Sequence, residues 1–125
     1  MRKFALSLAA VAVLSTLSLA APKSQTFTGE IMDSQCANMG SHAEMLKKEG
    51  MADKDPNDPM AKKMCTQGCV KMGGKYVLFD AASKTIYQLD DQSKPEKFAG
   101  GKVKVKGTLN KDTNTIHVTS IQAGS

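Results

Sequence analysis

The sequence contains no tryptophan, and its single arginine is Arg2. Aromatic residues make up only 5% of the chain. Proteins that bind nucleic acids depend heavily on arginine to hold phosphates and on aromatic rings to stack on bases. The excess of lysine therefore does not predict nucleic-acid binding, and we interpret the lysines as a solvated surface.

The chain also lacks a hydrophobic run long enough to span a bilayer, which needs about 20 residues. Its longest uncharged apolar run, Phe4–Leu19, follows Arg2 and Lys3 and ends in the small residues that a signal peptidase recognises. We therefore predict a signal peptide at residues 1–20, cleaved after Ala20, rather than a retained membrane anchor. The exported protein would be periplasmic or secreted.

Residues 21–125 are expected to form one domain, since about 105 residues suffice for one hydrophobic core and not for two. Loss of the two N-terminal cations lowers the formal net charge from +5 to about +3. No second apolar stretch is present, so we expect a soluble monomer without stable membrane insertion.

Motifs of the common catalysts are missing as well. The sequence has no nucleophile elbow and no phosphate-binding loop. Cys65 and Cys69 are separated by three residues, whereas thioredoxin-like redox catalysts place two residues between their cysteines. His117 is expected on the polar side of a strand, as a surface residue. We therefore predict a non-catalytic protein.

Two halves of different composition meet near Gly73 and Gly74. All three cysteines, His42 and every methionine of the exported chain precede this point, and the clearest strand patterns follow it. Alternating apolar residues predict five strands, with a helical turn at residues 94–99 between the third and the fourth. The predicted strands are residues 25–32, 76–79, 86–89, 102–109 and 115–121.

This order of elements predicts a mainly β fold, a five-stranded Greek-key barrel of the OB type. Residues 33–74, approximately, would form a helical insertion rich in Cys and Met between the first two strands. We expect one apolar set to fill the barrel: Phe27, Ile31, Val77, Phe79, Ile86, Leu89, Val103, Val105, Leu109, Ile116, Val118 and Ile121.

The insertion is expected to hold two helices joined by an exposed loop. A capping box at residues 41–44 predicts a helix through Glu49. Asp58 and Pro59 start a second helix, which Gly73 ends. Its spacing gathers Met60, Met64, Cys65, Cys69 and Met72 on one apolar face, which we expect to be buried. Cys36 is expected in a polar loop before both helices.

Several segments resemble small exported bacterial proteins with an OB-fold-like domain of unknown function. The resembling segments are residues 29–36, which contain Asp-Ser-Gln-Cys, residues 65–78, which contain Cys-x3-Cys and Gly-Gly, and residues 99–107 together with 115–118. The resemblance implies export, a barrel and a cluster of cysteines. It implies no activity.

Three cysteines in an exported chain leave two interpretations open. Cys36, His42, Cys65 and Cys69 form a Cys3His set that suits zinc or a soft ion such as Cu⁺. Alternatively, Cys36 forms a disulfide with Cys65 or Cys69, worth about 3–4 kcal/mol, and the third cysteine is a small buried apolar side chain.

Methionine is the second unusual feature, with seven residues, numbers 32, 39, 45, 51, 60, 64 and 72, in the insertion and beside it. Met39 and Met64 are candidates for secondary soft ligands, although methionine also fills irregular gaps in a core. Two functions follow as hypotheses. The protein is an envelope binder of a soft metal, or it is a disulfide-stapled module that binds a small ligand or another envelope protein.

Overall fold

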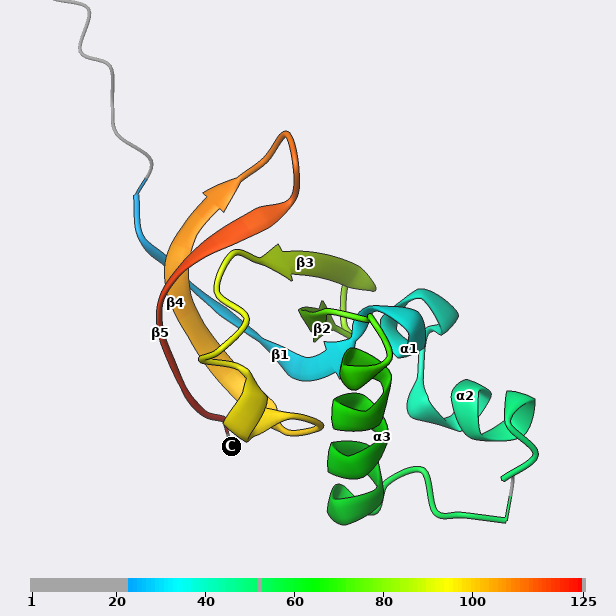
Figure 1. Cartoon of the computed structure of the whole chain (residues 1–125). Coiled ribbons are helices and arrows are strands. Elements are labelled where there is room, and N and C mark those ends of the chain that lie inside the picture. The colour runs from blue at the N-terminus through cyan, green and yellow to red at the C-terminus, as the bar shows by residue number, and fades with distance from the viewer. Residues whose placement is uncertain (1–22, 52, 125) are drawn as a thin grey trace, which may run out of the picture.

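The computed structural model describes residues 23–51 and 53–124. The predicted signal peptide lies outside the described residues. The chain forms five strands, as Figure 1 shows. The strands are β1 (Gln25–Asp33), β2 (Tyr76–Asp80), β3 (Thr85–Leu89), β4 (Lys102–Asn110) and β5 (Thr115–Ala123).

The pairing of the strands returns to its starting point. Strand β1 pairs with β4 through residues 25–30 and with β2 through residues 30–33, in both cases antiparallel. Strand β3 pairs antiparallel with β2 and parallel with β5, which pairs antiparallel with β4. The order β1-β2-β3-β5-β4 is that of a closed barrel. The prediction of a mainly β fold with five strands is confirmed.

Three helices separate β1 from β2, which confirms the predicted helical insertion. They are α1 (Ser34–Met39), α2 (His42–Lys48) and α3 (Pro59–Lys71), and a short 3-10 helix, η1 (Glu96–Phe98), precedes β4. In Figure 1 the three helices lie together beside the barrel, near β1 and β2. Within the described residues, none of the helices has the length and apolar character needed to span a bilayer.

The prediction that Cys36 lies in a loop is wrong, because the Asp33 side chain starts a helix there. Its carboxylate oxygen Oδ2 accepts hydrogen bonds from the backbone N–H groups of Gln35 at 2.9 Å and Cys36 at 3.2 Å. These donors have no partner inside a helix, so an aspartate at this position stabilises the first turn.

The apolar residues form two clusters instead of one. The barrel interior contains most of the predicted set, and Leu109 and Ile121 pack against it half-buried. Val77, Phe79 and Ile86 were predicted there wrongly. They belong to a second cluster on the outer face of the barrel, with Met32, Cys36, Ala37 and Met45. Tyr76 and Leu78 fill the interior at β2 instead.

The prediction that α3 buries its methionines is also wrong. Met60, Met64 and Met72 are 63%, 67% and 79% exposed. The helix turns the opposite face inward, where Thr66 is buried and Lys62 reaches the barrel. Two contacts require this orientation: an ion pair from Lys62 to Glu30, and the close approach of the α3 backbone to Gly100.

Gly100 allows α3 to approach the loop before β4. A Cβ atom added there would lie 2.7 Å from the carbonyl carbon of Lys62, and the residue has a φ of +75°. Gly50 has a similar φ of +72°, but no atom lies within 4 Å of its added Cβ. Substitution of Gly50 therefore tests backbone strain alone, whereas substitution of Gly100 tests backbone strain together with steric crowding.

We expect Gly50→Ala to lower the free energy of unfolding by about 1–2 kcal/mol, the cost of a left-handed conformation. Gly100→Ala should lower it by a further 1–3 kcal/mol or so, because overpacking adds to the same strain. Urea denaturation of both variants measures the difference. Equal losses would contradict the close packing of α3 on the barrel.

Candidate functional site

Each of the three inserted helices contributes one potential metal ligand to a single cluster. Cys36 comes from α1, His42 from α2 and Cys65 from α3, and their ligand atoms all lie within 4.8 Å of one another. In a tetrahedral zinc site with Zn–S bonds of 2.3 Å, two sulfur atoms lie about 3.8 Å apart. The three residues therefore need to move by only about 1 Å to hold one ion.

Local sequence features place these residues. Asp33 caps α1, and Gly40 ends it in a left-handed conformation with a φ of +89°. Ser41 then caps α2 by accepting a hydrogen bond from the N–H of Glu44 at 3.2 Å. Because the turn between α1 and α2 is this short, Cys36 and His42 lie near each other. Asp58 caps α3, with Pro59 at its start.

The two ring nitrogens of His42 differ in their hydrogen bonding among the described residues. Its Nε2 lies 3.0 Å from Oε1 of Glu30, whereas its Nδ1 is buried and has no hydrogen-bond partner among the described residues. When Nε2 donates its proton to Glu30, Nδ1 carries a lone pair. A carboxylate behind a histidine is the usual arrangement around a metal-binding imidazole.

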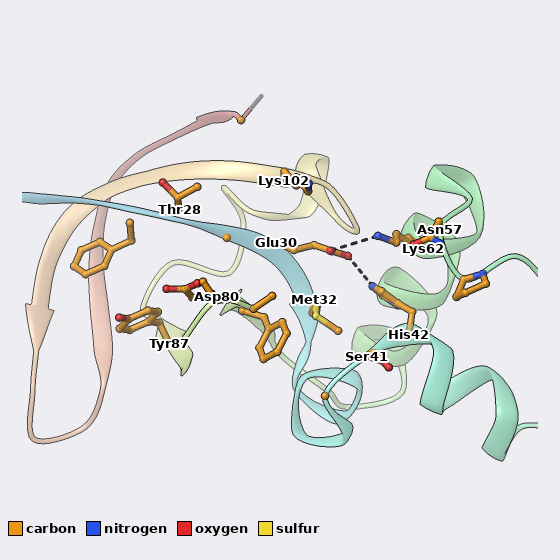
Figure 2. Close-up of a pocket in the computed structure, with 18 of the residues that line it drawn as sticks. Thr28, Glu30, Met32, Ser41, His42, Asn57, Lys62, Asp80, Tyr87 and Lys102 are labelled. Carbon is orange, nitrogen blue, oxygen red and sulfur yellow. Dashed lines mark hydrogen bonds and ion pairs between the residues drawn. The ribbon is translucent and has the colours of Figure 1, made fainter. Parts of the chain in front are cut away.

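Glu30 also binds α3. Its other oxygen, Oε2, lies 3.4 Å from the Lys62 ammonium. Figure 2 shows the Glu30 carboxylate between His42 and Lys62, which approach it from two different helices. Burial alone would raise the pKa of Glu30, but the hydrogen bond with His42 and the charge of Lys62 outweigh it, so the pKa lies below its ordinary value.

Two of the three thiols, those of Cys36 and Cys69, have a raised pKa, which favours their protonated form. Burial raises the pKa of Cys36 well above its ordinary value, and the neighbouring Asp33 carboxylate raises it further. Burial, followed by the charge of Asp33, raises the pKa of Cys69 to about 11. A metal ion that binds here must displace these protons, so its affinity rises with pH.

The structure places the other predicted ligands at different distances from the cluster. Cys69 lies near Cys65, and the two thiols interact electrostatically, but Cys69 is outside the close group. Met39 is half-buried against the same residues. Met64 is exposed on α3 and is not part of the close group, so its role as a secondary ligand stays a prediction. The structure has no disulfide among its three cysteines, which are all free.

Sequence reasoning missed Glu30 and Lys62 as parts of the site. The alternation in β1 marks Glu30 as lying on the outer face of the barrel, but only the position of the insertion shows that this face is covered. His117 is exposed, as predicted, and contacts the Asp90 carboxylate far from the cluster in sequence.

A cavity of about 950 Å³ lies between the insertion and the barrel, with Glu30 and His42 among its lining residues. Figure 2 shows it along β1, with Thr28 and Tyr87 lining it away from the two helices. Phe27 lines the cavity as well, and its ring centroid lies 5.3 Å from that of Tyr87.

The first part of β1 has no paired strand on the side that faces this cavity, among the described residues. Strand β2 pairs with β1 only from Glu30 onward. On the β4 side, Ile31 donates to Gly101 at 3.0 Å and accepts from Gly100 at 2.8 Å. Backbone groups alternate between the two sides of a strand, so the N–H and C=O groups of Thr26 and Thr28 point away from β4.

Together, the fold and the site define a small mainly β domain with a Cys/His cluster in a helical insertion. A protein-family model described as a protein of unknown function (DUF5818) matches residues 67–124. This range includes the end of α3 and strands β2 to β5, with Cys69, and it leaves out Cys36, His42 and Cys65. No curated protein and no solved structure matches the chain.

We expect Glu30→Gln to destabilise the protein at pH 7 by about 1.5–3 kcal/mol, the range for hydrogen bonds to charged groups. Because the folded pKa of Glu30 is lowered, its contribution is present above the unfolded pKa of about 4.3 and is lost as the pH falls through the folded value. The variant and the unaltered protein should therefore converge in stability at low pH.

The matched control is Glu44→Gln, which removes an exposed carboxylate that pairs with Lys47. Exposed pairs of this kind contribute little. Urea denaturation at pH 7 and at about pH 3 measures both variants. A loss for Glu30→Gln that is no larger than for Glu44→Gln would contradict the role of Glu30 in holding the helices.

Proposed function

We propose that this protein is an exported, non-catalytic component of the cell envelope that binds one soft metal ion. The ligands are Cys36, His42 and Cys65, with Cys69 as the fourth. One observation carries the proposal: three residues on three different helices bring their ligand atoms within 4.8 Å of one another.

The buried histidine favours the interpretation of the cluster as a metal site over the interpretation that its cysteines are only structural. A buried polar atom without a hydrogen bond costs free energy, and Nδ1 of His42 is such an atom among the described residues. A bound cation would satisfy this nitrogen and would replace the thiol protons of the cysteines. Glu30 would hold the imidazole in the orientation that binding requires.

The ligand types narrow the choice of ion. Three thiolates and one imidazole suit Zn²⁺ or Cu⁺, whereas Mg²⁺ and Ca²⁺ prefer oxygen ligands. Cys65 and Cys69 are half-buried while Cys36 is fully buried, so an ion would enter from the α3 side.

We assign the barrel to the OB type. The strand order β1-β2-β3-β5-β4 and the parallel contact between β3 and β5 support this assignment, as does a helical turn between β3 and β4. In such barrels the connection between the first two strands lies at the mouth of the binding face, and here that connection contains the cluster.

Metal titration of the exported, reduced protein tests the proposal. We expect one equivalent of Zn²⁺ or Cu⁺ to bind with release of thiol protons and to raise the stability, by about 2.7 kcal/mol at 100 times the Kd. Cys36→Ser and Cys65→Ser should each weaken binding at least 100-fold, because each removes a ligand of the close group. Cys69→Ser should weaken it less.

Counting the free thiols of the exported protein distinguishes metal binding from the disulfide alternative. Three reactive thiols after metal removal agree with the proposal. A single thiol, with Cys36 joined to Cys65 or Cys69, would show that the cysteines are structural and would overturn metal binding at this cluster.

The cavity beside β1 favours a second candidate function, the binding of an extended segment of an envelope protein. The backbone groups of Thr26 and Thr28, which have no strand partner on this side among the described residues, could add such a segment as a further strand. Lys62 and Lys102 are among the lining residues of the cavity and would receive an acidic side chain.

A photo-reactive residue placed at position 28 in the exported protein tests this second function in the native envelope. We expect cross-links to a defined partner from position 28 and none from position 119, an exposed position on β5. Cross-links of equal yield from both positions would contradict a specific site at the β1 edge.

A further inference from the structure

Methionine supplies the large hydrophobic side chains that are exposed on the described part of the chain. In the described residues, the large hydrophobic side chains that are exposed are Met51 (40%), Met60, Met64 and Met72. No leucine, isoleucine, valine or phenylalanine is among them. A surface that served only as an apolar contact could use any of these residues. The restriction to methionine therefore points to the chemistry of the thioether.

Two of these methionines lie one turn apart on α3. Residues i and i+4 of a helix have Cβ atoms about 5–6 Å apart, and Met60 and Met64 have this spacing on the face that points away from the barrel. Methionine has three rotatable bonds, so both sulfur atoms can reach a common ion. Met72 lies eight residues beyond Met64, a rise of about 12 Å, and cannot share that ion.

We propose that Met60 and Met64 form a second, outer metal site that takes Cu⁺. Thioethers carry no proton at any ordinary pH and form no disulfides, so they remain ligands in an oxidising compartment where free thiols do not persist. They are soft, neutral donors that bind Cu⁺ in preference to hard cations such as Mg²⁺ and Ca²⁺.

The outer site shares no ligand with the Cys/His cluster, so it goes beyond the proposed function and stands without it. The two sites are nevertheless neighbours, since Met64 and Cys65 are consecutive residues on α3. Thiolates bind Cu⁺ more tightly than thioethers, so an ion collected at Met60 and Met64 would move toward Cys65 rather than away from it.

The experiment uses the reduced, exported protein with ¹³C-labelled methionine methyl groups and follows them by NMR. Ag⁺ serves as a probe that stands in for Cu⁺ without redox chemistry, and a titration with Cu⁺ under argon repeats the measurement. After the thiols are saturated, we expect the methyl signals of Met60 and Met64 to shift together with one shared affinity. The signals of Met51 and Met72 should not follow.

Leucine variants identify the ligands, because leucine keeps the apolar area of methionine and removes its sulfur. Met64→Leu should weaken the response of Met60 at least tenfold. Met72→Leu is the matched control, because Met72 is an exposed methionine that caps the C-terminal end of the same helix, and it should leave the response of Met60 unchanged.

Two outcomes would overturn the outer site: shifts of Met60 and Met64 no larger than that of Met72, or an unchanged Met60 response in Met64→Leu. Failure of the Cys/His cluster gives a different result. In that case the methyl signals of Met60 and Met64 shift from the first addition of Ag⁺, with no initial equivalent taken up by the thiols. The two proposals can therefore fail separately.

Discussion

Strand β2 is buried on both of its faces, and this double burial joins the helical insertion to the barrel. Tyr76 and Leu78 point into the barrel, whereas Val77 and Phe79 pack under the helices. Removing either side would leave apolar surface in water, at a cost of about 25 cal/mol per Å². The insertion is therefore part of the core, and Cys36 packs against the same wall.

A single carboxylate completes the attachment. Glu30 projects from β1 and contacts two helices, through His42 of α2 and Lys62 of α3. It is 18% exposed, so these contacts are less screened than those of a surface ion pair. Because the same contact orients His42, Glu30 contributes both to the docking of the helices and to the geometry of the cluster.

The sequence predicts the order of the strands and the caps of two helices because these depend on local patterns. It does not predict which face of β2 enters the barrel, since Tyr76–Phe79 is an unbroken apolar run with no polar residue to set the alternation. The orientation of α3 is also hidden, because methionine is common in cores and at exposed soft-metal sites alike. The three candidate ligands are recognisable by residue type, while the role of Glu30 becomes visible only when the insertion is in place.

The cluster is held by interactions that do not need an ion. Helices α1 and α2 have six and seven residues, too few to be stable alone, and they are held by their caps, by β2 and by Glu30. Small zinc domains differ, because they unfold when the metal is removed. At the proposed metal site the candidate ligands are brought together by the barrel, so we expect that an ion would bind and leave while the fold persists. On this proposal the protein takes up and releases a metal rather than using it as a structural cross-link.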